Sequence, residues 1–147
     1  MRITYKGDYA LKAILDLANN YGDKPVSIQQ MAARLDIPIK FLEQVLLELK
    51  NGGFVESRRG KVGGYLLARP PEQISLGEVV RFIARPVEPI ACVENGYKGC
   101  RDLHKCVFRE VWQEVSLQSL RIIDAVTFQD LLIKFREKEQ EQPAYQI

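Results

Sequence analysis

The chain has 147 residues, enough for one domain or two small ones with a hydrophobic core. Its 46% hydrophobic and 27% charged residues are ordinary for a soluble globular protein, and no apolar run approaches the ~18 residues of a membrane helix. The N-terminus has no apolar signal-peptide core, so we expect a cytoplasmic protein in a reducing compartment. Residues 1–70 contain 11 lysines and arginines against 7 aspartates and glutamates, and this basic half is a mild indication of nucleic-acid binding.

Two amphipathic helices are predicted at the start of the chain. Apolar residues recur at helical spacing across residues 4–21, with Thr4 as the N-cap and Gly22 as the residue that ends the helix. A second helix begins at Ser27, whose side chain is expected to form a capping box with Gln30.

A third helix follows the break at residues 36–38 and ends at two glycines, residues 52 and 53. Its apolar residues predict a buried face, and Lys40, Glu43 and Gln44 lie on the other side. Two short helices joined by a three-residue turn are typical of a helix-turn-helix, whose second helix enters the major groove. Gln can pair with adenine and Glu can accept from cytosine. The alternative is an ordinary solvated helix face.

A β-hairpin is predicted directly after the third helix, with strands at 54–58 and 65–68. Its loop is rich in glycine and basic, and we expect Arg58, Arg59 and Lys61 to meet no acidic residue between Glu56 and Glu72. A hairpin at this place is the wing of a winged helix, and its tip can hold a phosphate or enter the minor groove. The alternative is a plain exposed hairpin.

The second half begins with a hinge at residues 69–71 and a helix at 75–84, capped by Ser75 and Glu78. A long helix is predicted from about Leu103, because one apolar face is sustained over ~4 turns. We expect this face to form a dimer, although packing on the chain's own first domain is the alternative. Trp112 is assigned to the core. The residues of the face are Phe108, Val111, Trp112, Val115, Ser119, Ile122 and Ile123.

A last helix is capped by Thr127 and Asp130 and leads into a polar tail. The predicted fold class is mainly α with a small β-hairpin wing: a winged helix-turn-helix DNA-binding domain at 1–84, a cysteine loop and dimerisation helices at 85–137, and a flexible tail at 138–147. The sequence contains one histidine and no P-loop, H-E-x-x-H motif or Ser/His/Asp set, so we do not expect an enzyme.

All three cysteines, Cys92, Cys100 and Cys106, lie in one glycine-containing loop with the spacing C-x7-C-x5-C. Thiolates are soft ligands that suit iron–sulfur clusters, zinc or copper(I). A metal or cluster site is favoured, and zinc ranks second because the spacing lacks the paired CxxC of a zinc ribbon. The alternatives are a disulfide with a spare thiol, or cysteines that serve as small apolar side chains.

Four segments resemble the IscR/NsrR/RirA family of winged-helix regulators over about residues 1–135: MRITYKGDYALKAILDLA, FLEQVLLELKNGGFVESRRG, GGYLLARP and ISLGEVV. The resemblance implies a cytoplasmic bacterial homodimer that binds palindromic operators in double-stranded DNA. It also implies an iron–sulfur cluster, 4Fe–4S favoured and 2Fe–2S possible, held by Cys92, Cys100 and Cys106. The family's base-reading positions correspond to Lys40, Glu43 and Gln44, and its wing contact corresponds to Arg59.

The fourth cluster ligand is where the chain departs from part of this family. IscR-type regulators have a histidine three residues after the last cysteine, but here that position is Arg109, which stays protonated and cannot ligate. The x7 spacing resembles the iron-responsive RirA branch. Asp8 resembles the nitric-oxide-sensing NsrR branch, in which the acidic residue comes from the partner subunit. We expect Asp8 of the other chain as the fourth ligand, with His104 in the loop as the alternative.

The sequence therefore predicts a transcription regulator whose operator binding depends on a cluster that senses iron or cluster status, oxygen or nitric oxide. A thiol- or zinc-based regulator of the same fold is one alternative. A redox or electron-transfer iron–sulfur protein, in which the winged helix is only a scaffold, is an alternative from a different class.

Overall fold

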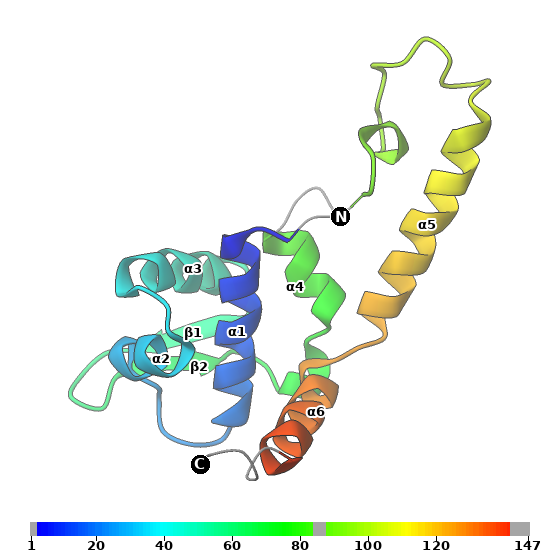
Figure 1. Ribbon diagram of the computed structural model, residues 1–147. Helices are drawn as coiled ribbons and strands as arrows, with labels where there is room; N and C mark the ends of the chain where they lie inside the picture. The colour runs from blue at the N-terminus through cyan, green and yellow to red at the C-terminus, as the bar shows by residue number, and fades with distance from the viewer. Residues whose placement is uncertain (1–2, 84–87, 142–147) are drawn as a thin grey trace.

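The computed structural model describes residues 3–83 and 88–141 and is mainly helical, with one two-stranded antiparallel sheet, as predicted (Figure 1). Within these residues no helix is both long and apolar enough to cross a membrane. In chain order the elements are α1 (Tyr5–Asn19), α2 (Ile28–Leu35), α3 (Ile39–Asn51), β1 (Val55–Arg58), β2 (Gly64–Leu67), the 3-10 turn η1 (Pro71–Gln73), α4 (Leu76–Ile83), the 3-10 turn η2 (Ala91–Val93), α5 (Val107–Asp124) and α6 (Phe128–Glu141).

One hydrophobic core joins α1, α2, α3, the hairpin, α4 and α6. Its centre is formed by fully buried side chains at helical spacing, such as Ile14 of α1 and Leu42, Leu46 and Leu49 of α3. Each such side chain stabilises the fold by roughly 1.5–3 kcal/mol relative to an exposed one. The predicted apolar faces of the first three helices are therefore the faces that meet in the core.

The helix caps form largely where the sequence places them. Thr4 Oγ1 accepts a hydrogen bond from the Gly7 N–H at 3.2 Å, and Ser27 and Gln30 form the full capping box. Helix α1 ends at Asn19, two residues earlier than predicted, because the Asn20 side chain donates to the Asp16 carbonyl at 2.7 Å and Asn20 serves as the C-cap.

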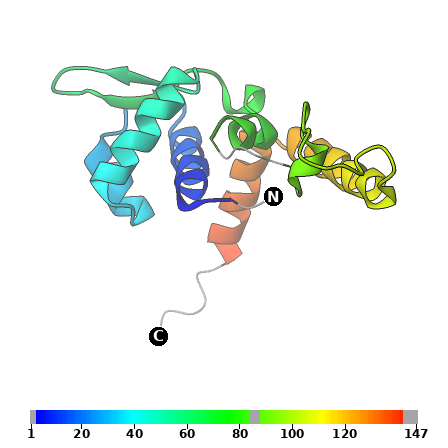
Figure 2. The same cartoon turned by 90° about the horizontal axis from the view of Figure 1, so that it is seen from above.

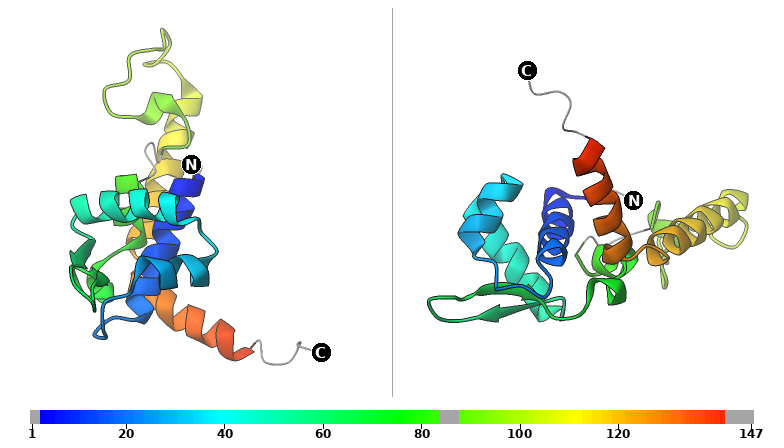
Figure 3. Two further views of the ribbon diagram at one scale, coloured as in Figure 1. Left: turned by 90° about the vertical axis from the view of Figure 1, so that its left-hand side faces the viewer. Right: turned by 90° about the horizontal axis from the view of Figure 1, so that it is seen from below.

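The strands of the hairpin are fixed to the body, and the loop between them extends beyond it. Tyr65 and Val26 exchange two backbone hydrogen bonds of 3.0 and 2.8 Å, so a third segment pairs with β2. Lys50, at the end of α3, donates to Ser57 Oγ of β1 at 2.6 Å. Figure 3 shows α3 and the hairpin on the same side of the body. The hairpin is therefore held at a fixed position beside α3, as a wing requires.

The segment at 69–71, predicted as a hinge, is a fixed corner. Arg69 donates to the Gln73 carbonyl at 3.0 Å and to Glu78 Oε1 at 2.8 Å, and its guanidinium lies 5.5 Å from the centre of the Phe54 ring. Ser75 Oγ accepts the Glu78 N–H as expected. The Glu78 carboxylate, which we expected to complete a capping box, binds Arg69. This corner joins the wing to α4.

Helix α5 projects from the body together with the cysteine loop (Figures 1 and 2). It begins at Val107, four residues later than predicted, because residues 101–105 form a turn in which the Lys105 N–H donates to the Asp102 carbonyl at 2.9 Å. Its C-terminal part contacts α4: Leu120 and Ile123 pack on Val80.

Helix α6 returns to the body and packs against α1. Phe128 and Leu132 are buried in the main core, and Arg136 donates to Asn19 Oδ1 at 3.2 Å. By its packing α6 therefore belongs with the N-terminal core, which differs from the predicted division at 85–137. The helix also continues to Glu141, past the predicted start of the tail at 138; residues 142–147 lie outside the described part.

Two glycines of the wing provide a test of how its second strand is attached to the body. Gly64 has φ +154°, and a Cβ there would collide with the Val26 carbonyl; Gly60 has φ +113° and open space around it. Gly60→Ala should cost about 1–3 kcal/mol of unfolding free energy through backbone strain alone. Gly64→Ala should cost more, because the new Cβ also separates Val26 from Tyr65. Urea unfolding of both variants measures the difference; equal losses would contradict the proposed role of the Val26 contact.

Candidate DNA-binding surface and cysteine loop

Lys40, Glu43 and Gln44 all lie exposed on α3. At 3.6 residues per turn, Lys40 and Gln44 point away from the buried Leu42 and Leu46, and Glu43 lies on a flank. Helix α3 and the wing both lie on the side of the body away from α5 (Figures 1 and 2). The structure therefore brings the three predicted base-reading residues onto one accessible surface.

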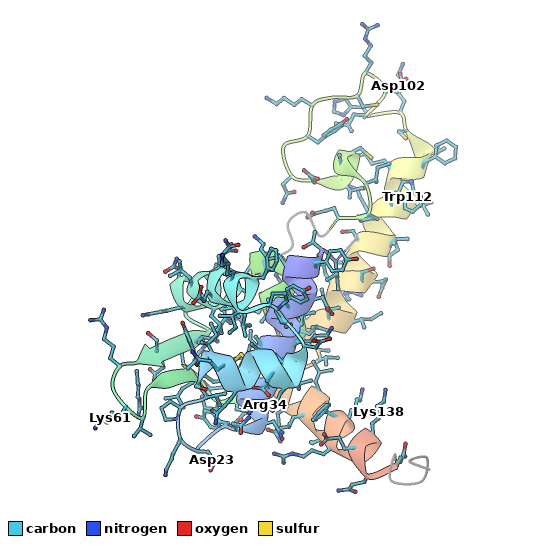
Figure 4. All side chains as sticks on the ribbon, turned by 60° about the vertical axis from the view of Figure 1, so that its left-hand side comes forward. Asp23, Arg34, Lys61, Asp102, Trp112 and Lys138 are labelled. Carbon is cyan, nitrogen blue, oxygen red and sulfur yellow. The ribbon has the colours of Figure 1, made fainter. Side chains whose placement is uncertain are left out.

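Arg58, Arg59 and Lys61 are exposed on the wing, and Figure 4 shows Lys61 at its tip. Arg58 Nη2 lies 3.5 Å from Glu56 Oε1, the residue before the stretch without acidic residues, because residues two apart on a strand share a face. Both side chains are more than half exposed, so this ion pair contributes little and leaves the guanidinium accessible. The wing therefore offers three cations, of which Arg58 has an acidic neighbour.

The orientation of α2 depends on a contact that the sequence did not reveal. Arg34 binds Asp16 of α1 through Nε and Nη2 at 2.9 and 2.7 Å, and these hydrogen bonds raise the pKa of Arg34. The Asp16 side chain is 8% exposed. The two residues are 18 positions apart, so no local pattern predicts the pair. It holds α2, the first helix of the helix-turn-helix, on α1.

The three cysteines are free thiols on different parts of the loop. Cys92 is half-buried in η2, Cys106 is the half-buried N-cap of α5, and Cys100 is exposed between them. Arg109 Nε donates to the Cys92 carbonyl at 2.9 Å and so holds η2 against the first turn of α5. Two of the thiols therefore lie on elements that contact each other, and the third lies on the open part of the loop.

The donor set suits an iron–sulfur cluster in its chemistry, because three free thiols in one loop can supply three soft ligands. Their arrangement is open: within residues 3–83 and 88–141 no group of three or more Cys, His, Asp or Glu side chains lies close enough to hold a metal ion. A cluster at these residues would require Cys100 to approach the other two.

The two candidates for a fourth ligand lie on different elements. Asp8 is in the first turn of α1, where its carboxylate is paired with Lys12 at 2.7 Å and lines a surface hollow of about 690 Å³. His104 is exposed in the turn at 101–105. Neither belongs to a metal-binding group with the cysteines in the part of the chain that the structure describes.

Helix α5 has no buried residue in the described chain. Ile123 and Leu120 face α4, so one side of the helix packs on its own domain. A separate apolar stripe remains uncovered, and Trp112, which we assigned to the core, is 40% exposed on it. The other members of this stripe are Val107, Phe108, Val111, Val115 and Ile122, at 41–71% exposure.

Comparison with known proteins gives consistent matches over nearly the whole chain. Residues 3–134 match the Rrf2 family, described as iron-dependent transcriptional regulator. An rrf2-like protein of Rhodobacter capsulatus is 41% identical over 88% of this chain and 91% of that one, and IscR of Escherichia coli is 34% identical over 90% and 80%.

The solved structures include CymR, the global cysteine regulator of Bacillus subtilis, with a TM-score of 0.76 and 28% identity over 91% of this chain and 98% of that one. IscR of T. potens has a TM-score of 0.74 and 31% identity over 99% and 94%. The matched relatives are regulators, not enzymes, and the fold with its wing agrees with theirs. The chain therefore belongs to the Rrf2 family of winged-helix transcriptional regulators.

Proposed function

We propose that the protein is a homodimeric, cytoplasmic DNA-binding regulator whose operator binding is controlled by an iron–sulfur cluster on Cys92, Cys100 and Cys106. The observation that carries this proposal is the attachment of the loop to α5. Through Arg109 the Cys92 segment is bonded to the first turn of a helix that packs on α4 at its other end. The family description and the IscR relatives support an iron-linked signal.

The loop supplies three of the ligands, and a 4Fe–4S cluster is favoured over 2Fe–2S. When bound, such a cluster provides a redox-active centre that oxygen or nitric oxide can damage. Cys92 and Cys106 would supply the two ligands next to α5, and Cys100 would supply the third from the open part of the loop. Loss of the cluster would free the Cys100 segment and change the charge at the end of α5.

Asp8 of the partner subunit is our preferred fourth ligand, and His104 is the alternative. The Asp8 carboxylate is accessible, and its exposed pair with Lys12 contributes at most about 1 kcal/mol, so a metal can compete for it. A bond across the dimer would tie the state of the cluster directly to the position of α1, which packs against the proposed reading helix.

A second copy of the chain is the proposed cover of the α5 stripe. Six large apolar side chains along one helix are costly to leave in water, and two stripes related by a two-fold axis would bury each other. A two-fold dimer also fits a palindromic operator. In each half, α3 would enter the major groove with Lys40, Glu43 and Gln44, while Arg58, Arg59 and Lys61 of the wing would bind phosphates or the minor groove.

A thiol-based regulator of the same fold is the second candidate. The thiols are free and do not converge in the described chain, and one structural neighbour is a global cysteine regulator. Oxidation of Cys100 would then be the signal, because it is the exposed thiol of the three. A zinc site on the same cysteines is distinguished from both candidates by the metal that the purified protein contains. An electron-transfer role is distinguished by the absence of DNA binding.

The central experiment is purification without oxygen, followed by DNA binding before and after exposure to air. The probe is a duplex selected from a pool of random sequences. Wild-type protein should be coloured, and Cys92→Ser, Cys100→Ser or Cys106→Ser should remove most of the visible absorbance, because an alcohol is a poor ligand compared with a thiolate. Lys105→Ser, in the same loop, is the control and should keep its colour. Colourless wild-type protein with tightly bound zinc would reject the cluster.

The fourth ligand is tested with Asp8→Ala and His104→Ala, each loaded with iron and sulfide under anaerobic conditions. Asp8→Ala should change the visible spectrum and should make DNA affinity independent of cluster loss. His104→Ala should behave like the wild type in both measurements. The reverse pattern would mean that the loop completes its own site.

Base reading and phosphate binding are separated by Gln44→Ala and Lys61→Ala. Gln44→Ala should reduce base preference by ~1–3 kcal/mol at one position of each half-site. Lys61→Ala should weaken all sequences alike and reduce the slope of affinity against salt by about one ion. Titrations of matched and mismatched duplexes at several salt concentrations provide the measurement. A Gln44→Ala variant that loses affinity equally for all sequences would contradict the reading-helix assignment.

The dimer is tested with Val111→Asp, which places an unpaired charge on the stripe and should cost several kcal/mol of association. Light scattering should then detect a monomer with weakened DNA binding. Leu117→Asp introduces the same charge at an exposed leucine on another side of α5 and should leave the dimer intact. An unchanged dimer in Val111→Asp would mean that the copies meet elsewhere.

A further inference from the structure

A small cleft lies between the first two turns of α1 and the N-terminal half of α3, with a volume of about 370 Å³. Two of its aromatic rings are unusually open to water: Tyr5 is 83% exposed and Phe41 is 57% exposed. The Tyr5 and Tyr9 ring centres are 6.4 Å apart. The full lining is Tyr5, Lys6, Tyr9, Phe41, Gln44 and Val45.

The hydrophobic core does not require these two exposed rings. Leu42 and Val45 already supply the buried face of α3 at this level, and Ala10 and Ala13 supply that of α1. Tyr5 and Phe41 are therefore apolar surface that folding leaves uncovered. Large exposed aromatic side chains grouped around a cleft are typical of a binding site.

The cleft is continuous with the proposed base-reading surface, because Gln44 belongs to both. Gln44 points outward from α3 and also lines the cleft. Beside the cleft, Lys6 Nζ lies 3.0 Å from Glu48 Oε2 and neutralises that carboxylate. Three of the six lining side chains are aromatic, so the cleft is better suited to an apolar group than to a phosphate.

The chemistry of the major groove identifies that apolar group. Gln44 lines the cleft, so if Gln44 meets a base edge in the major groove, the aromatic side chains beside it lie next to the neighbouring base pair. Each base edge offers hydrogen-bonding atoms, and thymine alone adds an apolar group, its 5-methyl. A glutamine can bind the adenine of an A·T pair, and an aromatic ring beside it can contact the methyl group of a thymine next to that pair.

We propose that the cleft between Tyr5 and Phe41 receives the 5-methyl group of one thymine in each half-site, next to the base pair that Gln44 reads. This inference rests on the proposed role of α3 as the reading helix. It adds α1 to the elements that determine sequence preference. Part of that preference would then come from apolar contact with Tyr5 and Phe41, in addition to hydrogen bonds.

The experiment replaces thymine by uracil, which removes the methyl group and keeps every hydrogen-bonding atom. A duplex is first selected from random sequences with wild-type protein, and each thymine of one half-site is then exchanged in turn. At one position uracil should weaken binding about fourfold, the value expected for one buried methyl group. Phe41→Ala should bind the thymine duplex less tightly and should no longer distinguish thymine from uracil at that position; Tyr5→Ala should reduce the distinction.

Leu47→Ala and Tyr21→Ala are the matched controls. Leu47 is an exposed apolar residue of α3 outside the cleft, and Tyr21 is an exposed tyrosine in the turn after α1. Both variants should keep the full uracil effect. Since Phe41 is more than half exposed, Phe41→Ala should fold, and the scan with wild-type protein gives an answer in any case.

Three results would overturn the proposal while leaving the reading helix intact: a selected half-site without thymine, a wild type that tolerates uracil at every position, or a Phe41→Ala variant that retains the discrimination. A protein that enriches no sequence, or whose selected sequence is unaffected by Gln44→Ala, would overturn the proposed reading helix and this inference together.

Discussion

Helix α4 contacts both α5, which carries the cysteine loop, and the elements of the candidate DNA-binding surface. Val79 and Ile83 are buried in the main core, whereas Val80 packs on Leu120 and Ile123 of α5. At one end of α4 the Asp124 carboxylate lies against Gly77, where no Cβ would fit, and binds Arg81 at 2.6 Å. Helix α5 therefore cannot shift far along α4 without breaking an ion pair and opening a packed contact.

The same helix fixes the DNA-binding side. The Phe82 ring lies against Gly52, the C-cap of α3, and 5.3 Å from the Phe54 ring at the start of the wing. The guanidinium of Arg69 lies over the Phe54 ring and also binds Glu78 of α4. The end of the proposed reading helix and the root of the wing therefore both rest on α4. A change in the angle between α5 and α4 would move these two parts together, which is the coupling that a regulator with a distant sensor needs.

Local patterns predicted the helices well because their caps and apolar spacing are local properties. Ser27 with Gln30, and the buried face of α3, follow from residues at most ten positions apart. The Arg34–Asp16 pair and the return of α6 onto α1 depend on contacts between distant parts of the chain, so no local pattern contains them. Periodicity also revealed an apolar stripe on α5 without saying what covers it, which is why Trp112 was wrongly assigned to the core. The spacing of the cysteines has the same limit, because it gives a candidate ligand set and does not say whether the three thiols come together.

Arg109 has a structural role in the cysteine loop. At the position where IscR-type regulators have a histidine, this chain has a side chain that cannot ligate and that binds the Cys92 carbonyl instead. The guanidinium holds the Cys92 segment on α5 through a hydrogen bond within the chain, so this part of the loop is attached to the helix. A bound cluster would therefore fix mainly the segment around Cys100. It would also fix the contact with the residue that supplies the fourth ligand. A sensor built in this way would report the cluster through the outer part of the loop, while the inner part keeps its place on α5 in both states.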